Sequence, residues 1–293
     1  MKKLLIVGFG DVAHRALPAL AGRYRVVALS RSADRAARET PSVEAIHGDL
    51  DRPESLASLA ATAAELVLHC APPPNAGFDD PRTRHLLDAL GSAEMLPQRL
   101  VYLSTSGVYG DCGGAYVDES RPVNPQSDRA RRRVDAERQL GVWARGHGIR
   151  LVALRVPGIY AAGRLPLARL RAGTPVLRGE DDSYTNHIHA DDLAAIAVRA
   201  LEHPEARGEF NACDDSEMKM GDWFDLVADR HGLPRPPRIG RDEAQTRIAP
   251  ALLSFMRESR RLVNRRMKEV LGVRLRYPTV HEGVPRALAA APN

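Results

Sequence analysis

Three small residues near the start of the chain have the spacing of a phosphate-binding turn. Gly8, Gly10 and Ala13 follow an apolar run and precede a helical pattern, in the order G-x-G-x-x-A. Gly8 permits a tight turn, Gly10 lets a pyrophosphate approach the backbone, and Ala13 lets the helix pack closely on the strand. The first N–H groups of a helix favour negative charge. The pattern predicts a dinucleotide site, and the alternative is an ordinary turn whose small residues serve packing.

The end of the second apolar run bears on which dinucleotide binds. Ser30 and Arg31 stand there, roughly 20 residues beyond the glycines, where an NAD site places an Asp or Glu on the ribose 2′-hydroxyl. A guanidinium and a hydroxyl suit a 2′-phosphate. We therefore expect NADP as the cofactor, with NAD as the alternative. The competing interpretation of Arg31 is a solvated loop arginine.

Hydroxyl groups gather at the end of a later apolar run, at residues 104–106. A hydroxyl at the carboxyl end of a parallel strand faces the crevice in which ligands bind, which predicts a ligand contact for Thr105. The alternative is a hydroxyl that caps its own loop. Tyr109 and Tyr116 follow, and each is a candidate proton carrier or a ring that binds without transferring a proton.

A basic segment covers residues 126–139. Its five arginines are Arg129, Arg131, Arg132, Arg133 and Arg138. Arg131 and Asp135 are four residues apart, as are Arg133 and Glu137, so we expect ion pairs within one helix to neutralise part of the charge. The chain shows no interleaved aromatic platform and no recognised nucleic-acid module, so this pattern disfavours binding to nucleic acid.

The composition is that of a globular protein. The 293 residues are 44% hydrophobic and 27% charged, with a net charge of +5. The three cysteines are far apart, which fits neither a metal clip nor a disulfide framework, so we expect no metal and a cytoplasmic protein. No run of about 18 apolar residues occurs, so we expect no membrane span. A monomer or a homodimer is expected.

Apolar runs alternate with helical patterns along the first half of the chain. The runs are residues 3–8, 25–30, 43–48, 65–71, 99–106 and 150–156, and the helical patterns are residues 11–23, 53–63, 81–93 and 128–148. This alternation predicts an α/β protein with a Rossmann-type doubly wound parallel sheet. We expect residues 1–157 to form that domain, with 184–212 returning to it. Residues 158–183 and 213–293 would form a smaller, mostly helical C-terminal lobe.

Several segments, in this order, resemble the extended short-chain dehydrogenases of the NAD(P)-dependent epimerase/dehydratase family. They are the glycine turn, HGDLDRPESL, LHCAPPP, LSTSGVYG, LRVPGIYAAG, NHIHADDLAAIAVRAL and SRRLVNRRMKEVLG. The resemblance implies that Asp49 contacts adenine and that Thr105 polarises the reacting oxygen. It also implies a C-terminal lobe that often holds a nucleoside-diphosphate sugar. The expected cofactor-binding residues are Gly8, Gly10, Asp11, Val12, Ser30, Arg31, Asp49, Leu50, Ala71, Pro72, Pro73, Ser104 and Arg133.

The chain departs from the family at its catalytic pair. The resemblance leads us to expect Tyr-x-x-x-Lys followed four residues later by Glu, and Glu137 fits that acid. Counting back places Arg133 at the lysine and Arg129 at the tyrosine. Arginine stays charged and cannot carry a proton back and forth, although Arg133 could hold the nicotinamide ribose as a lysine would. The expected catalytic residues are therefore Thr105, Tyr109, Arg129 and Arg133.

Two functions are compatible with this pattern. The first is an NADP(H)-dependent oxidoreductase or epimerase that acts on a nucleotide sugar or a small carbonyl compound with non-standard proton-transfer residues. The second is a catalytically inactive module that senses NADP(H). We favour the enzyme because Thr105 and Tyr109 are retained. His187 and His189 are expected to be structural, because no further metal ligands accompany them.

Overall fold

The computed structural model describes residues 1–33 and 40–285. A seven-stranded sheet with the order β12-β7-β5-β4-β1-β2-β3 lies at its centre, and every neighbouring pair is parallel. Its strands are β1 (Lys2–Val7), β2 (Tyr24–Ser30), β3 (Glu44–His47), β4 (Leu66–His69), β5 (Arg99–Thr105), β7 (Arg150–Val156) and β12 (Gly208–Asn211). The predicted doubly wound α/β fold is confirmed.

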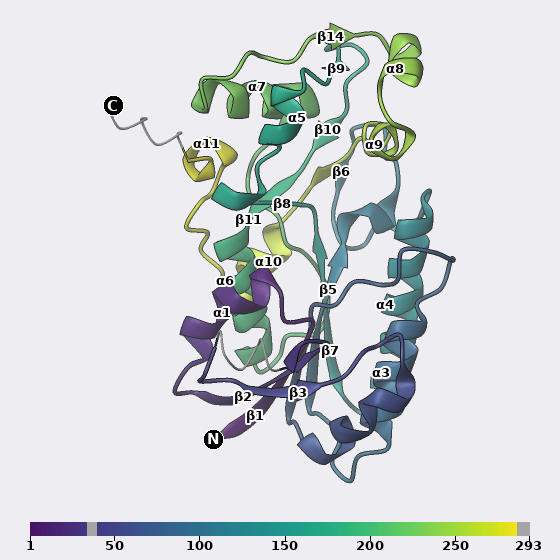
Figure 1. The fold of residues 1–293 in the computed structure, drawn as a ribbon, viewed down its shortest axis with the longest axis vertical. Coiled ribbons are helices and arrows are strands. Elements are labelled where there is room, and N and C mark those ends of the chain that lie inside the picture. The colour runs from purple at the N-terminus through teal and green to yellow at the C-terminus, as the bar shows by residue number, and fades with distance from the viewer. Residues whose placement is uncertain (34–39, 286–293) are drawn as a thin grey trace.

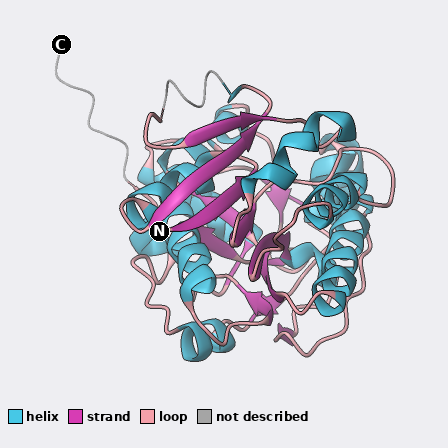
Figure 2. Ribbon diagram, turned by 90° about the horizontal axis from the view of Figure 1, so that it is seen from below, coloured by secondary structure: helices cyan, strands magenta, loops and turns pink. Residues whose placement is uncertain are grey.

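Helices cover both faces of this sheet (Figures 1 and 2). One face carries α1 (Asp11–Leu20), α6 (Ala190–Glu202) and α10 (Arg265–Leu271), and the other carries η1 (Pro53–Thr62), α3 (Pro81–Gly91) and α4 (Asp128–Gly146). In β1, Leu4 and Ile6 pack on the first face, whereas Leu5 and Val7 pack on the second. A strand buried on both faces needs apolar residues at successive positions, which explains the unbroken apolar runs in the sequence.

Residues 53–62 form the expected helix, which is of the 3₁₀ type, with Leu56, Leu59 and Thr62 buried at the three-residue spacing of that helix. The ion pairs expected within the helix at residues 128–148 were wrong. In α4, Arg131 pairs with Asp128, not with Asp135, and the Nη–Oδ distance is 3.6 Å. The expected pairs placed the base before the acid, which is the weaker order along a helix.

The upper part of the molecule in Figure 1 is the smaller lobe. Its elements are β8 (Gly158–Tyr160), η3 (Ala162–Arg164), α5 (Leu167–Arg171), β9 (Val176–Leu177), β10 (Tyr184–Thr185), β13 (Met218–Lys219), α7 (Met220–Arg230), β14 (Arg238–Ile239), α8 (Arg241–Arg247), α9 (Pro250–Phe255) and α11 (Val280–Gly283). Trp223 and Phe224 of α7 lie in its apolar core with Leu170. This lobe therefore has a core of its own.

Parts of the C-terminal half return to the sheet. Strand β12 pairs with β7, and α6 packs against α1. Met267 and Leu271 of α10 belong to the apolar cluster beside the sheet, so this part of the segment 213–293 packs with the Rossmann-type domain. Among the described residues, no helix combines the length and the apolar character that crossing a membrane requires.

Short pairings tie the two parts together. β11 (His187–His189) pairs with β8, and β15 (Arg261–Leu262) pairs with β6 (Tyr116–Val117), which follows the short helix η2 (Ser106–Tyr109). Ser259 reinforces the second pairing, because its carbonyl accepts from the N–H groups of Cys112 and Gly114. The segment 258–262 is thereby held beside the loop that follows β5.

Candidate active site

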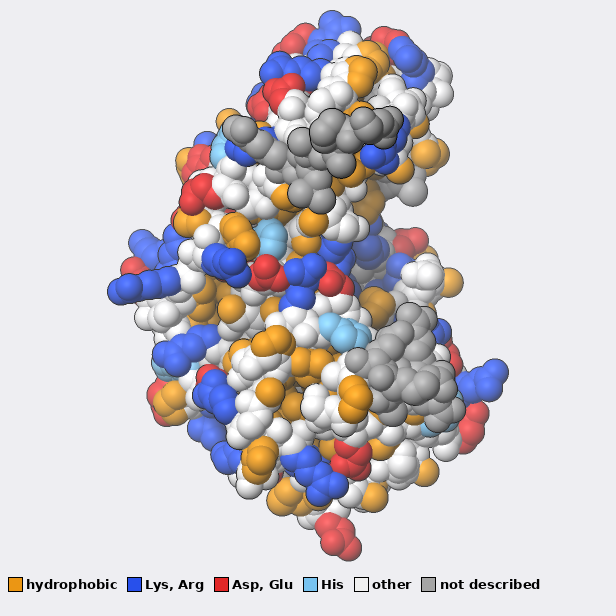
Figure 3. Space-filling model, turned by 60° about the vertical axis from the view of Figure 1, so that its left-hand side comes forward, with side chains coloured by type: hydrophobic (Ala, Val, Ile, Leu, Met, Phe, Trp, Pro, Cys, Tyr) orange, Lys and Arg blue, Asp and Glu red, His pale blue; other side chains and the backbone are white. Residues whose placement is uncertain are grey.

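The strand order of the sheet reverses between β1 and β4. In an open α/β sheet, ligands bind at the carboxyl ends of the strands beside such a switch point. Two clefts lie at this edge, one around the ends of β1 and β2 and one around the end of β5. In the space-filling view, a hollow separates the upper lobe from the sheet domain, and Lys and Arg side chains gather along it (Figure 3).

The glycine turn between β1 and α1 has two different steric requirements. Gly8 has φ +88°, and a Cβ there would lie 2.4 Å from the backbone N of Ala71. Gly8 is therefore required by the fold itself. A Cβ at Gly10 would meet nothing within 4 Å, so the fold does not demand glycine there. The open space before the helix fits a pyrophosphate that approaches the backbone at Gly10.

The cleft beside this turn has a volume of about 390 Å³. It brings together eight of the expected cofactor-binding residues: Gly8, Gly10, Ser30, Arg31, Asp49, Leu50, Ala71 and Pro72. Arg31 is exposed at the end of β2, and Asp49 follows β3. The residues present fit a dinucleotide, whose pyrophosphate would lie over the glycines and whose ribose would lie at Ser30 and Arg31.

Three other expected cofactor residues, Asp11, Val12 and Pro73, do not line this cleft. Asp11 accepts hydrogen bonds from Arg15 of its own helix and from Arg164 of the smaller lobe, at 2.9 Å and 3.1 Å. Burial acts to raise its pKa, but these two bonds lower it on balance. Val12 is buried in the core, and Pro73 is buried with its carbonyl accepting from a guanidinium.

That guanidinium belongs to Arg82, which the sequence interpretation missed. Arg82 lines the cleft from the start of α3 and makes a bidentate ion pair with Asp51, with distances of 2.7 Å and 2.5 Å. Its Nη1 also donates to the carbonyls of Pro72 and Pro73. Arg82 lies near the start of α3, and the loop before this helix brings it to the cleft. No spacing of residues in the sequence indicates that placement.

The second cleft has a volume of about 190 Å³. Of the four expected catalytic residues, it brings together Thr105 and Arg129. The other residues that line it are Ser106, Gly107, Pro157, Gly158, Tyr184, Thr185, Asn186, Met220, Phe255, Glu258 and Arg260. The sequence interpretation missed Tyr184, Phe255 and Glu258, which reach this cleft from the smaller lobe and the segment after it.

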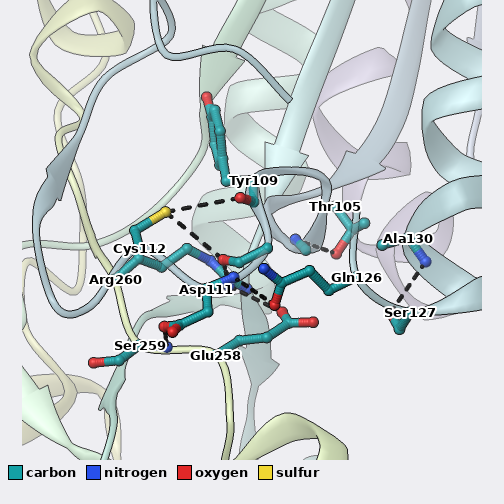
Figure 4. A network of polar contacts seen from close by, with 12 residues as sticks. Thr105, Tyr109, Asp111, Cys112, Gln126, Ser127, Ala130, Glu258, Ser259 and Arg260 are labelled. Atoms are coloured by element: carbon teal, nitrogen blue, oxygen red, sulfur yellow. Dashed lines mark hydrogen bonds and ion pairs between the residues drawn. The ribbon is translucent and has the colours of Figure 1, made fainter. Parts of the chain in front are cut away.

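Thr105 ends β5 and is half-buried at the cleft. Its hydroxyl oxygen accepts from the N–H of Gly107 at 3.2 Å and so begins the short helix η2. A hydroxyl has one donor and two acceptor sites, so the proton of Thr105 is still available to a ligand. Figure 4 shows the Thr105 side chain beside the start of α4, at Ser127 and Ala130.

Arg129 reaches the same cleft from the first turn of α4. Its guanidinium carbon lies 3.9 Å from the centre of the Phe255 ring. The guanidinium makes no hydrogen bond or ion pair to any residue in the described part of the chain. Burial lowers the pKa of Arg129, and the neighbouring Arg260 lowers it further, whereas Glu258 acts in the opposite direction.

Arg133 lies one turn further along α4 and lines neither cleft. Its Nη1 donates to the Tyr102 hydroxyl at 3.0 Å and to the Leu103 carbonyl at 2.7 Å. Burial lowers the pKa of His69 and raises that of Cys70, which lines the dinucleotide cleft, and the positive charge of Arg133 acts to lower both. Arg133 is therefore anchored to β5, beneath the dinucleotide cleft.

A buried polar network occupies the space behind β5. Glu137 accepts a hydrogen bond from Ser104 and a 2.9 Å bond from Arg155. Arg155 also donates to the Tyr109 hydroxyl, which donates to the Oδ1 of Asn211, at 3.0 Å and 2.9 Å. The five residues of this network satisfy one another within the core.

This network places Ser104 and Tyr109 away from the clefts. Ser104 is 4% exposed and Tyr109 is 1% exposed, and neither lines a described cleft. Figure 4 shows the Tyr109 ring pointing away from Thr105. Burial raises the pKa of Tyr109 to about 12. A proton carrier must lie within hydrogen-bond reach of its substrate, so this geometry argues against the expected role of Tyr109.

Three further residues have defined places outside the clefts. Tyr116 is 55% exposed on the surface, where its hydroxyl donates to Glu217 at 2.8 Å. His187 is buried against Trp223, with 4.3 Å between the ring centres. His189 begins α6 and accepts from the N–H of Asp191. Both histidines therefore have structural contacts.

Comparison with known proteins identifies the family. A model of the NAD dependent epimerase/dehydratase family matches residues 5–213. The chain belongs to this family. It is similar to a GDP-6-deoxy-D-mannose reductase from Pseudomonas aeruginosa, with 27% identity over 206 residues, or 62% of this chain and 68% of that protein. The predicted membership is confirmed, and NAD(P) binding follows from it.

Solved structures share the fold over nearly the whole chain. A conserved protein of unknown function from Silicibacter pomeroyi has 29% identity and a TM-score of 0.77, with 97% of each chain covered. A UDP-glucose 4-epimerase from Thermus thermophilus, in complex with NAD, has 20% identity and a TM-score of 0.73, with 96% of each chain covered. The second likeness concerns the fold alone.

Proposed function

We propose that this protein is an NADP(H)-dependent oxidoreductase or epimerase that acts on the carbonyl carbon of a nucleotide sugar or of a small carbonyl compound. The observation that carries the proposal is the pair of clefts at one edge of the sheet. One is lined by Gly8, Gly10 and Arg31, and the other by Thr105 and Arg129. Bound NADP(H) supplies hydride transfer, and the protein orients the reacting groups.

The choice of NADP over NAD rests on Ser30 and Arg31. Both line the dinucleotide cleft at the end of β2, where a 2′-phosphate would lie. The test is a fluorescence titration of the purified chain with NADPH and with NADH. NADPH should bind at least about tenfold more tightly, because a charged hydrogen bond contributes roughly 1.5–3 kcal/mol. Arg31→Asp should reverse the preference, and equal affinities in the wild type would refute it.

The chain's own residues suggest a division of roles in the second cleft. Thr105 donates a hydrogen bond from its hydroxyl to the substrate oxygen and so holds that oxygen in place. Tyr184 lines the same cleft, and its hydroxyl has no hydrogen bond to any described residue. We propose Tyr184 as the group that transfers the proton, in the place that the sequence interpretation gave to Tyr109. Arg133 is held on β5 and lines neither cleft, so no contact with the cofactor is proposed for it.

Turnover tests these roles. Oxidation of NADPH should be measured against a panel of aldehydes, ketones and nucleotide sugars. Thr105→Ala and Tyr184→Phe should each lower kcat by about a hundredfold or more, the range expected when an oxygen-stabilising donor is lost. Thr105→Ser should restore most of the rate. Equal rates in the wild type and in both variants would contradict the assignment.

The alternative function is an inactive NADP(H) sensor. The enclosure of Tyr109 in the core and the arginines on α4 favour it, because neither provides a proton. A sensor should bind NADP and NADPH with different affinities and oxidise no member of the panel. One processed substrate would refute this alternative.

A further inference from the structure

The second cleft contains an arginine, Arg129, that makes no hydrogen bond or ion pair with any described residue. Arg129, Arg260 and Glu258 are the charged residues that line it among those described. Arg260 pairs with Glu258 at 2.9 Å and also donates to the Gly110 carbonyl at 2.7 Å. Figure 4 shows this pair beside Asp111, below the loop that follows Thr105. Arg260 is therefore paired within the protein, whereas Arg129 has no hydrogen-bond or ion-pair partner among the described residues.

The guanidinium of Arg129 is held in an orientation that suits ligand binding. Phe255 supports one flat face of the guanidinium, with 3.9 Å between the guanidinium carbon and the ring centre. The N–H groups lie in the plane of the guanidinium, so stacking leaves them free to donate. None of them meets an acceptor within the described part of the chain. A planar fork of N–H donors matches a carboxylate or a phosphate.

The surroundings disfavour Arg129 unless an anion is present. Burial removes part of its hydration, and Arg260, Arg132 and Arg133 repel it, whereas Glu258 attracts it; on balance the pKa of Arg129 is lowered. Arg132 is itself held by the Gly77 carbonyl at 2.7 Å and cannot serve the cleft. Hydrogen bonds to an anion in the cleft would replace those that Arg129 has lost to water, and the negative charge would offset the repulsion. The same guanidinium in solvent would gain much less from that anion.

The size of the cleft limits the ligand. Its volume is about 190 Å³. Sites for larger organic ligands usually measure roughly 300–1,000 Å³. Thr105 lies in the same cleft as Arg129, so one small molecule can contact both.

We propose that the second cleft binds a small carbonyl compound that carries a carboxylate or a phosphate, with Arg129 as the anchor of that anionic group and Thr105 at the carbonyl oxygen. The inference rests on the proposed function for the presence of a reacting carbonyl. It goes further in naming the substrate class and in assigning Arg129 to binding rather than to proton transfer. The small volume of the cleft favours such a compound over a nucleoside-diphosphate sugar.

Anion binding tests the anchor without relying on turnover. The full chain is titrated calorimetrically at constant ionic strength with oxalate, with inorganic phosphate and with neutral oxamide. We expect saturable binding of one or both anions and none of oxamide. Arg129→Gln should weaken that binding at least tenfold, and Arg129→Lys should recover part of it. Preference for oxalate identifies a carboxylate substrate, and preference for phosphate identifies a phosphate substrate.

The matched control is Arg131→Gln on the same helix. Arg131 is exposed, pairs with Asp128 and lines neither cleft. Its variant should bind both anions as the wild type does. Absence of saturable anion binding in the wild type overturns the inference, as does equal weakening in Arg129→Gln and Arg131→Gln. NADPH affinity measured on the same proteins tests the proposed function separately, and Arg129→Gln should leave it unchanged.

A paired substrate panel provides a second readout. Each carbonyl compound that bears a carboxylate is compared with its methyl ester, which has nearly the same shape and no charge. The acid should have a kcat/KM at least tenfold higher, and Arg129→Gln should remove this difference mainly through KM. If esters and acids react equally well, Arg129 does not anchor an anionic group of the substrate, although the protein is an enzyme. If nothing reacts, the proposed enzyme function is at fault and the anion titration still judges the anchor.

Discussion

The guanidinium of Arg129 lies over the ring of Phe255, with 3.9 Å between the guanidinium carbon and the ring centre. The two residues come from different parts of the molecule, α4 of the sheet domain and α9 of the smaller lobe. Their contact turns an arginine of a basic helix into part of a cleft. The contact also gives a role to the Phe255 side chain, which is 46% exposed.

Removal of the Phe255 ring should weaken anion binding without unfolding the protein. A cation–π contact contributes about 0.5–2 kcal/mol, so Phe255→Leu should raise the Kd for the bound anion about twofold to thirtyfold. The calorimetric titration measures it. Phe78→Leu is the control, because Phe78 is 62% exposed and lies under Arg131, outside both clefts. Equal anion affinity in Phe255→Leu and the wild type would contradict the role of the stack.

Tyr109→Phe should lower stability and leave turnover almost unchanged. The change removes the donor to Asn211 and an acceptor for Arg155, both inside the core. A buried group left without its partner costs about 1–3 kcal/mol. Urea denaturation measures the loss, and NADPH oxidation measures the rate. A steep fall in kcat with unchanged stability would restore Tyr109 as a proton carrier.

The two glycines of the turn should respond in opposite ways to alanine. Gly8→Ala forces a Cβ to 2.4 Å from the Ala71 backbone at φ +88°, and we expect a loss of about 2 kcal/mol or more. Gly10→Ala meets nothing within 4 Å, so the free energy of unfolding should be unchanged or slightly higher. Its NADPH affinity should nevertheless fall, because the methyl group occupies the approach of the pyrophosphate. Intact NADPH binding in Gly10→Ala would place the cofactor elsewhere.

Asp214 should make stability depend on pH. Its Oδ1 accepts from the Ser216 N–H at 2.9 Å, but its buried Oδ2 has no hydrogen-bond partner among the described residues, and burial raises its pKa to about 7. Between the ordinary pKa and 7 the folded state holds a proton that the unfolded state has released. The contribution of Asp214 to stability therefore falls as pH rises through this range.

Asp214→Asn keeps the acceptor for Ser216 and removes this titration. Relative to the wild type, the variant should gain about 2–3 kcal/mol in free energy of unfolding between pH 5 and pH 8. Urea denaturation at both pH values gives the difference. A constant difference between the two proteins across that range would show that Asp214 is ionised in the folded state throughout.

The sequence by itself determined the sheet and the dinucleotide cleft. Strands buried on both faces require unbroken apolar runs, and a βα turn that approaches another loop closely requires Gly8. Both requirements leave a pattern of residue types and spacings along the chain, so they can be recognised from the sequence. The expected residues around the glycine turn accordingly meet in one cleft.

Only the tertiary structure decided which groups face the second cleft. Tyr109 follows β5 closely in sequence, but Arg155 and Asn211 draw its hydroxyl into the core. Tyr184 and Phe255 reach the cleft from distant segments, through pairings and packing of the smaller lobe. The orientation of a side chain depends on partners that the chain brings together on folding, and no pattern of neighbouring residues records them. For the same reason, the four-residue spacings along α4 did not predict that Arg133 would bind β5 and that Glu137 would bind Arg155.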